Sequence, residues 1–202
     1  EEEIGSPHLA GLVGDNRELL RADLAITSDG PLHRDGRPQL VLGTRGQLGV
    51  EIVAHGANRD AHAGSLGGVL PDPAWDLVRS LASLRTPAGG ISVPGFEESI
   101  RPATPAERAL LASLPLDIAA HCAEYGIAGL PGPEGPGYYE RLMFRPTMTI
   151  CGLSAGYSGP GMKTVLSQVA QARLDIRLVP DQDPDIVFGQ LAAHLASIDR
   201  SL

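Results

Sequence analysis

The sequence predicts an α+β domain in which an antiparallel sheet carries two helices on one face. Two segments alternate apolar and polar residues, the period of a strand that buries one face, and a third, shorter segment is also expected to be a strand. Two further segments begin with Asp-Pro, a favourable helix start, and continue with apolar residues at helical spacing. The strands are expected at 47–55, 146–152 and 168–179, and the helices at about 72–84 and 183–198.

The order of these elements narrows the fold class. Strand, helix, strand, strand, helix is five-sixths of a split βαβ, or ferredoxin-like, arrangement in two layers. The sixth element would be a strand, and the sequence ends at Leu202 before one appears. We therefore expect the last strand to be missing and one sheet edge to be exposed or covered by a partner.

The first and last strands show the alternation most clearly. In the first, the apolar face is formed by Leu48, Val50, Ile52 and Ala54. In the last, one face is formed by Ala170, Ala172, Leu174, Ile176 and Leu178, and the other by Gln171, Arg173, Asp175 and Arg177. Each strand is therefore expected to turn its polar face away from the helices.

The first 38 residues differ in character from the rest. Ser6 and Pro7 suit the start of a short helix, because serine caps helices and proline fits the first turn. Residues 21–28 form a short apolar run, which predicts a buried strand that ends at Asp29. Residues 30–38 are rich in glycine and proline, as in a linker, so a domain boundary is expected there.

Residues 85–145 are expected to be an insertion in the second domain. Thr104-Pro-Ala-Glu107 is a capping box that starts a helix, and a second short helix is expected at 117–125. Residues 126–137 are nearly all glycine and proline, which predicts a long loop, and such loops usually cover something. The hypothesis is that the insertion lies over a neighbouring catalytic domain.

Composition excludes several classes of function. The 202 residues weigh 21.1 kDa, carry a net charge of −8 and have a pI near 5.2, so neither nucleic acid nor a membrane is an expected partner. The cysteines Cys122 and Cys151 lie far apart and predict buried, reduced thiols in a cytoplasmic protein. The sequence begins at Glu1 instead of methionine, which predicts a piece of a longer protein.

His62 is the strongest single candidate for chemistry. It lies in a glycine-rich loop after the first strand, close to Asp60, where an imidazole is free to donate a hydrogen bond to a developing oxyanion. The alternative is a loop histidine bonded to its own turn. For the glutamates 1–3 the residues alone favour a solvated acidic terminus beside a helix start.

Five blocks of sequence resemble the di-zinc aminoacylase/carboxypeptidase metallopeptidase family, in its carnosinase-type dipeptidase branch. They follow the order of the family and span nearly the whole chain. The blocks are Glu1-Glu-Glu-Ile-Gly-Ser-Pro7, Gly43-Thr-Arg-Gly46, Asn58-Arg-Asp-Ala-His62-Ala-Gly-Ser-Leu-Gly-Gly68, Gly156-Tyr-Ser-Gly-Pro-Gly-Met-Lys-Thr-Val165 and Asp175-Ile-Arg-Leu-Val-Pro180. The resemblance implies that residues 35–202 form the lid, or dimerisation, domain and that residues 1–34 are a fragment of the zinc catalytic domain, which is α/β.

The resemblance also implies roles for single residues. In the intact enzyme, Glu2 would be the general base that takes a proton from a water bridging two zinc ions, and Glu3 and Asp29 would be metal ligands. His62, from the lid of the other subunit of a homodimer, would stabilise the oxyanion. Arg177 would clamp the substrate carboxylate and Thr164 would add a hydrogen bond.

The remaining zinc ligands of the family lie outside this sequence. We therefore expect the isolated chain to bind no zinc tightly and to be inactive. The parent protein is expected to cleave an amide next to a free carboxylate in a small peptide or an acylated amino acid. Two alternatives stay open: a non-catalytic dimerisation or interaction module, and a deacylase on the same scaffold.

Overall fold

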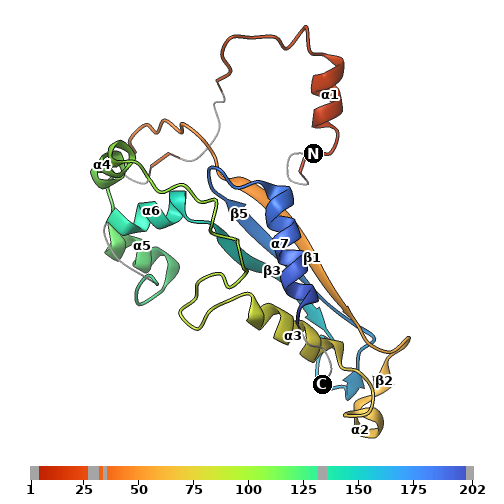
Figure 1. The fold of residues 1–202 in the computed structure, drawn as a ribbon. Helices are drawn as coiled ribbons and strands as arrows, with labels where there is room; N and C mark the ends of the chain where they lie inside the picture. Colours follow the sequence, from red (N-terminus) through yellow and green to blue (C-terminus); the bar gives the residue numbers. More distant parts are fainter. Residues whose placement is uncertain (1–4, 27–31, 34–35, 132–135, 199–202) are drawn as a thin grey trace. The chain divides into compact units, whose positions relative to one another are not determined.

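A computed structural model describes residues 5–26, 32–33, 36–131 and 136–198. The chain divides into two compact units, residues 1–42 and residues 43–202 (Figure 1). The second unit contains the predicted sheet and both predicted helices. The assignment of the first residues to a catalytic domain stays a proposal.

The main sheet of the second unit has three antiparallel strands. They are β1 (Gly46–His55), β5 (Val169–Leu178) and β3 (Thr147–Ala155), in the order β1-β5-β3. β1 and β5 pair along their whole length, from Gly46 opposite Leu178 to His55 opposite Val169. The predicted antiparallel sheet is confirmed. Its edge strands are β1 and β3, and among the described residues each pairs with β5 alone.

Two helices cover one face of this sheet (Figure 1). They are α3 (Pro73–Ser83) and α7 (Pro184–Ala196), and each begins as predicted, with an aspartate that caps the first turn and a proline just after it. The core lies between the two layers and includes Phe96, Leu174, Ile176 and Leu191. The apolar face of β5 is buried along the whole strand, as its alternation predicts.

A second, smaller sheet lies beyond the end of β1. It pairs β2 (Ala61–His62) with β4 (Val165–Leu166), and the short helix α2 (Ala63–Leu66) follows β2 directly. Figure 1 shows β2 and α2 at the tip of the domain. The sequence predicted only a glycine-rich loop here, because two-residue strands carry no alternation to detect.

In the described part of the predicted insertion, residues 85–131 and 136–145, there are three helices. They are α4 (Pro105–Ser113), α5 (Ile118–Tyr125) and α6 (Pro136–Phe144). The capping box of Thr104 and Glu107 is present, and Asp117 caps α5, so both expected helices are confirmed. The expected loop 126–137 was wrong at its end, because α6 begins at Pro136, where proline is well suited to the first helical position.

Part of this segment belongs to the core. Val93 and Phe96 are 5% and 1% exposed, and the side chain of Gln182 joins the Phe96 carbonyl to the Val179 amide. Cys122 is buried as predicted, but Cys151 is exposed. The prediction failed for Cys151 because it is the extra residue of a β-bulge between Ile150 and Gly152 on an edge strand.

The first unit contains the helix α1 (Leu9–Asp15). Its N-cap is His8 and no side chain caps it, so the predicted start at Ser6 and Pro7 was wrong by two residues. The strand predicted at 21–28 is absent from its described part, residues 21–26, where Leu24 and Ile26 are 75% and 85% exposed. A strand needs a pairing partner for its backbone, and residues 5–26 offer none.

Candidate functional site

His62 stands at the tip of the domain in a defined position. The β2–β4 pairing places it opposite Val165, and the amide of Ala63 donates to the carbonyl of Thr164. The side chain is exposed, and its Nε2 lies 3.3 Å from the hydroxyl oxygen of Thr164. The structure therefore brings together two of the residues that the sequence selected, 102 positions apart.

The helix α2 packs closely against the imidazole because of a glycine. A Cβ atom added at Gly64 would lie 2.8 Å from Cε1 and 3.1 Å from Nδ1 of His62. Such distances are well inside van der Waals contact, so any larger residue would displace the ring. Sequence analysis did not single out Gly64, although it lies two residues from the histidine.

Asp60 has a different role from the one its proximity suggested. Its Oδ1 accepts a hydrogen bond of 2.9 Å from the amide of Gln168, just before β5. Asp60 therefore ties the loop that carries His62 to the start of the central strand. The alternative of a histidine bonded to its own turn is also incorrect, because the imidazole of His62 contacts the hydroxyl of Thr164, just before β4, and not a residue of its own loop.

Arg177 lies near the other end of the sheet, on the face that carries no helices. Its Nε donates 2.8 Å to Oδ2 of Asp175, and Oδ1 of Asp175 accepts 3.1 Å from Nε2 of Gln47 on β1. Both oxygens of this carboxylate are therefore occupied. Within the described residues, neither Nη atom of Arg177 has a hydrogen-bond partner, and the side chain is 38% exposed.

Arg45 directly precedes β1 on the same face as Arg177. Its Nη1 is buried and has no hydrogen-bond partner among the described residues. Burial, and then the positive charge of Arg177, lower the pKa of Arg45, while Asp175 raises it. Two guanidinium groups and one carboxylate therefore influence one another at this end of the sheet.

His62 and Arg177 are not brought together within one chain. Arg177 lies eight residues along β5 from Val169, which is roughly 26 Å of extended strand, and His62 lies beyond that end. A dipeptide backbone is only about 7 Å long when fully extended. One chain therefore does not place both residues on the same small peptide.

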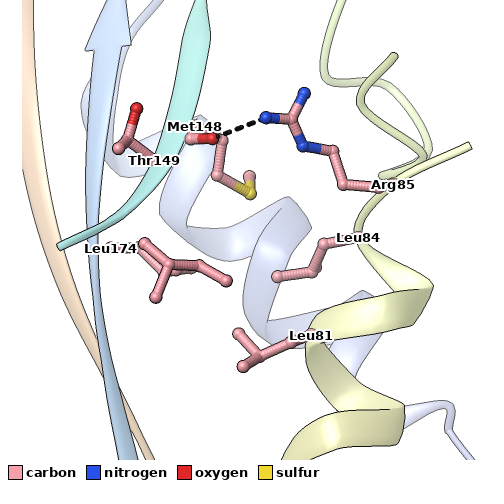
Figure 2. Close-up of a pocket in the computed structure, with 7 residues that line it drawn as sticks. Leu81, Leu84, Arg85, Met148, Thr149 and Leu174 are labelled. Carbon is pink, nitrogen blue, oxygen red and sulfur yellow. Dashed lines mark hydrogen bonds between the residues drawn. The ribbon is translucent and has the colours of Figure 1, made fainter. Parts of the chain in front are cut away.

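One hollow of the domain lies away from both His62 and Arg177. This hollow, of about 220 Å³, lies between the end of α3 and β3 and is lined mainly by Leu81, Leu84, Met148 and Leu174. Figure 2 shows Arg85 at its rim, where Nη2 donates 3.0 Å to the carbonyl of Met148. None of the predicted site residues lines this hollow.

The metal ligands expected from the resemblance lie outside the described residues. This applies to Glu3 and Asp29, and also to Glu2, the expected general base. In the part of the chain that the structure describes, no group of three or more His, Cys, Asp or Glu side chains is arranged to bind a metal ion. The described residues alone therefore do not fit a zinc centre.

The fold and its polar clusters define a two-layer α+β domain with a histidine at one tip and an arginine cluster near the other end. A family model described as a peptidase dimerisation domain matches residues 42–201. The chain belongs to this family, the dimerisation domains of the M20 metallopeptidases. The recognition and the fold class predicted from the sequence are thereby confirmed.

Known relatives resemble nearly the whole chain. The rat (Rattus norvegicus) Beta-Ala-His dipeptidase is 29% identical over 98% of this chain and 40% of its own length. The M20 family metallo-carboxypeptidase Sso-CP2 from Sulfolobus solfataricus is 36% identical, with a TM-score of 0.88 over 96% of this chain and 44% of its own. The Saccharomyces cerevisiae dipeptidase Dug1p is 27% identical, with a TM-score of 0.89 over 97% of this chain and 41% of its own.

The chain therefore spans about 40% of the length of these relatives. Their names describe a metallo-carboxypeptidase and dipeptidases. No helix among the described residues is long and apolar enough to cross a membrane.

Proposed function

We propose that this chain is part of a zinc-dependent dipeptidase or aminoacylase-type hydrolase and that its sheet domain is a lid that mediates dimerisation. The proposed substrate is a small peptide or acylated amino acid, cut at an amide next to a free carboxylate. Zinc, when bound, activates the attacking water. Glu2 would take the proton of that water, with Glu3 and Asp29 among the metal ligands.

The described residues support two roles in this reaction. His62 is exposed, and its contact with Thr164 orients the ring so that it donates a hydrogen bond to the oxygen of the scissile amide. Arg177 has two Nη atoms without partners among the described residues, which suits bidentate binding of a carboxylate. In this proposal Thr164 orients His62 and also contacts the substrate.

The separation of these residues is the observation that carries the proposal. His62 and Arg177 lie roughly 26 Å or more apart along one sheet, so they can act on one dipeptide only if they come from different chains. A homodimer with a twofold axis satisfies this requirement, because each chain then gives its histidine to the site of the other. A non-catalytic interaction module would need neither residue.

Mixed dimers test this arrangement in the intact protein. We expect His62→Ala and Arg177→Ala each to abolish most dipeptide hydrolysis alone. After the two variants are unfolded and refolded together, half of the dimers are mixed and contain one complete site, so about a quarter of wild-type activity should return. If mass spectrometry verifies the mixed dimers but no activity returns, both residues serve one site from the same chain.

A further inference from the structure

The open face of the sheet holds an arrangement of charge that the proposed reaction leaves unexplained. Asp175 is fully occupied, by Gln47 at 3.1 Å and by Nε of Arg177 at 2.8 Å. A guanidinium bound through Nε to a carboxylate has a fixed plane, and its two Nη atoms form the opposite edge. Asp175 therefore determines which way the free edge of Arg177 faces.

Arg45 adds a second positive charge at the same place. Strand alternation puts it on the open face with Gln47, diagonal to Arg177, because Gly46 pairs with Leu178. Its buried Nη1 has no acceptor anywhere in the described residues, and buried donors without partners are rare in folded proteins. Two cations and one carboxylate leave a net charge of +1, which matches one singly charged anion.

We propose that Arg45 and Arg177 together form a receptor for one carboxylate group, and that Asp175, held by Gln47, is the positioning residue that turns the Nη edge of Arg177 toward it. The receptor rests on the proposed function, in which Arg177 meets the carboxylate of the substrate. It adds Arg45 as a second contact and assigns Asp175 and Gln47 to orientation. A substrate whose carboxylate is amidated would lose both guanidinium contacts.

The neighbouring row of the sheet supplies a matched control. Glu51 and Arg173 form an ion pair of 3.1 Å between the same two strands, on the same open face. Removing Glu51 therefore disturbs the face and its charge to a similar extent without touching the receptor. A change in KM that appears in the Asp175 and Arg45 variants but not in Glu51→Ala therefore reports on the receptor and not on the stability of the sheet.

The experiment compares a dipeptide with its C-terminal amide as substrates of the intact enzyme. We expect Asp175→Ala and Arg45→Gln each to raise KM for the dipeptide about tenfold, with kcat little changed and the amide unaffected. Asp175→Asn, which keeps an acceptor for Arg177 Nε, should restore part of the loss. Glu51→Ala should leave both substrates at wild-type values, and Gln47→Leu, a milder change, should raise KM in the same direction.

The outcomes separate the receptor from the proposed function. If the wild type hydrolyses the dipeptide but KM is unchanged in Asp175→Ala and Gln47→Leu, or rises equally for the amide, the receptor is overturned and the hydrolase stands. If the wild type hydrolyses neither substrate, the proposed function is wrong. The receptor is then tested by nuclear magnetic resonance, through the Nε–H signal of Arg177. A shift with N-acetylglycine that weakens in Asp175→Asn supports the receptor, and no shift overturns it.

Discussion

At the scale of single residues, the position of His62 depends on Gly64. A Cβ at residue 64 would meet the far end of the imidazole at 2.8 Å, and that exposed ring is free to move aside. We expect Gly64→Ala to leave the free energy of unfolding within about 1 kcal/mol of wild type and to lower kcat about tenfold to a hundredfold. Thermal unfolding and steady-state kinetics of the intact protein measure the two effects.

Gly189 provides the control for this substitution. It lies inside α7, and a Cβ there would meet nothing within 4 Å. Gly189→Ala should therefore keep wild-type kcat and stabilise the helix slightly. Unchanged kcat in Gly64→Ala would contradict the view that close packing of α2 positions the imidazole.

The sequence predicts some site residues and misses others for a physical reason. His62, Thr164 and Arg177 stand in recognisable motifs, and the structure places the side chains of the first two 3.3 Å apart, which the motifs did not predict. Arg45 comes near Arg177 only when β1 and β5 pair, so no local pattern reveals it. Gly64 lies two residues from His62, but its close contact with the imidazole depends on the backbone path of α2, which the sequence does not show. Asp175 was placed on the same face as Arg177 by alternation, but its bond to Gln47 depends on the register of β1 and β5.

At the scale of elements, the start of α4 makes a prediction about acid stability. The Glu107 carboxylate accepts hydrogen bonds of 2.8 Å and 2.9 Å from the guanidinium of Arg101 and another from the amide of Thr104. The bonds from Arg101, and then that from Thr104, lower the pKa of Glu107 from 4.5 to about 2. A depressed pKa in the folded state stabilises the protein above the unfolded value of 4.5, and this contribution is lost as the pH falls toward 2. Glu107→Gln should therefore be less stable than wild type at pH 7, and the difference should shrink steadily between pH 4.5 and 2.

Chemical denaturation at a series of pH values measures this difference. Glu98→Gln serves as the control, because within the described residues the Glu98 side chain has no ion pair. Its stability should follow that of wild type across the whole range. A Glu107→Gln difference that does not depend on pH would mean that the ion pair with Arg101 is absent in solution.

The elements that could be predicted are those whose own sequence contains a clear pattern. The strands of the main sheet and the helices α3, α4, α5 and α7 carry alternation, stripes or caps that act over a few residues. The helix α6 begins in a segment rich in glycine and proline and lacks such a signal. The strand expected at 21–28 shows the opposite case, since an apolar run becomes a strand only where another strand is available to pair with it.

At the scale of the whole molecule, the distance between His62 and Arg177 is the feature that sequence alone does not supply. Both residues were selected from motifs, which carry no distance. The length of the paired strands β1 and β5 shows that they lie roughly 26 Å or more apart. In the proposed function, a chain arranged in this way has half of a substrate site at each end. Activity should then be a property of the dimer and not of its subunits.

Dilution of the intact enzyme tests this dependence. As the protein concentration falls below the dissociation constant of the dimer, specific activity should fall in proportion to the remaining dimer, because each separated chain lacks the histidine of its neighbour. Analytical ultracentrifugation at matching concentrations gives the dimer fraction. Two chains fused by a flexible linker should keep their specific activity on dilution, since the second chain then stays at a high effective concentration. Full activity of the unlinked enzyme at concentrations where only monomers sediment would mean that each chain completes its own site.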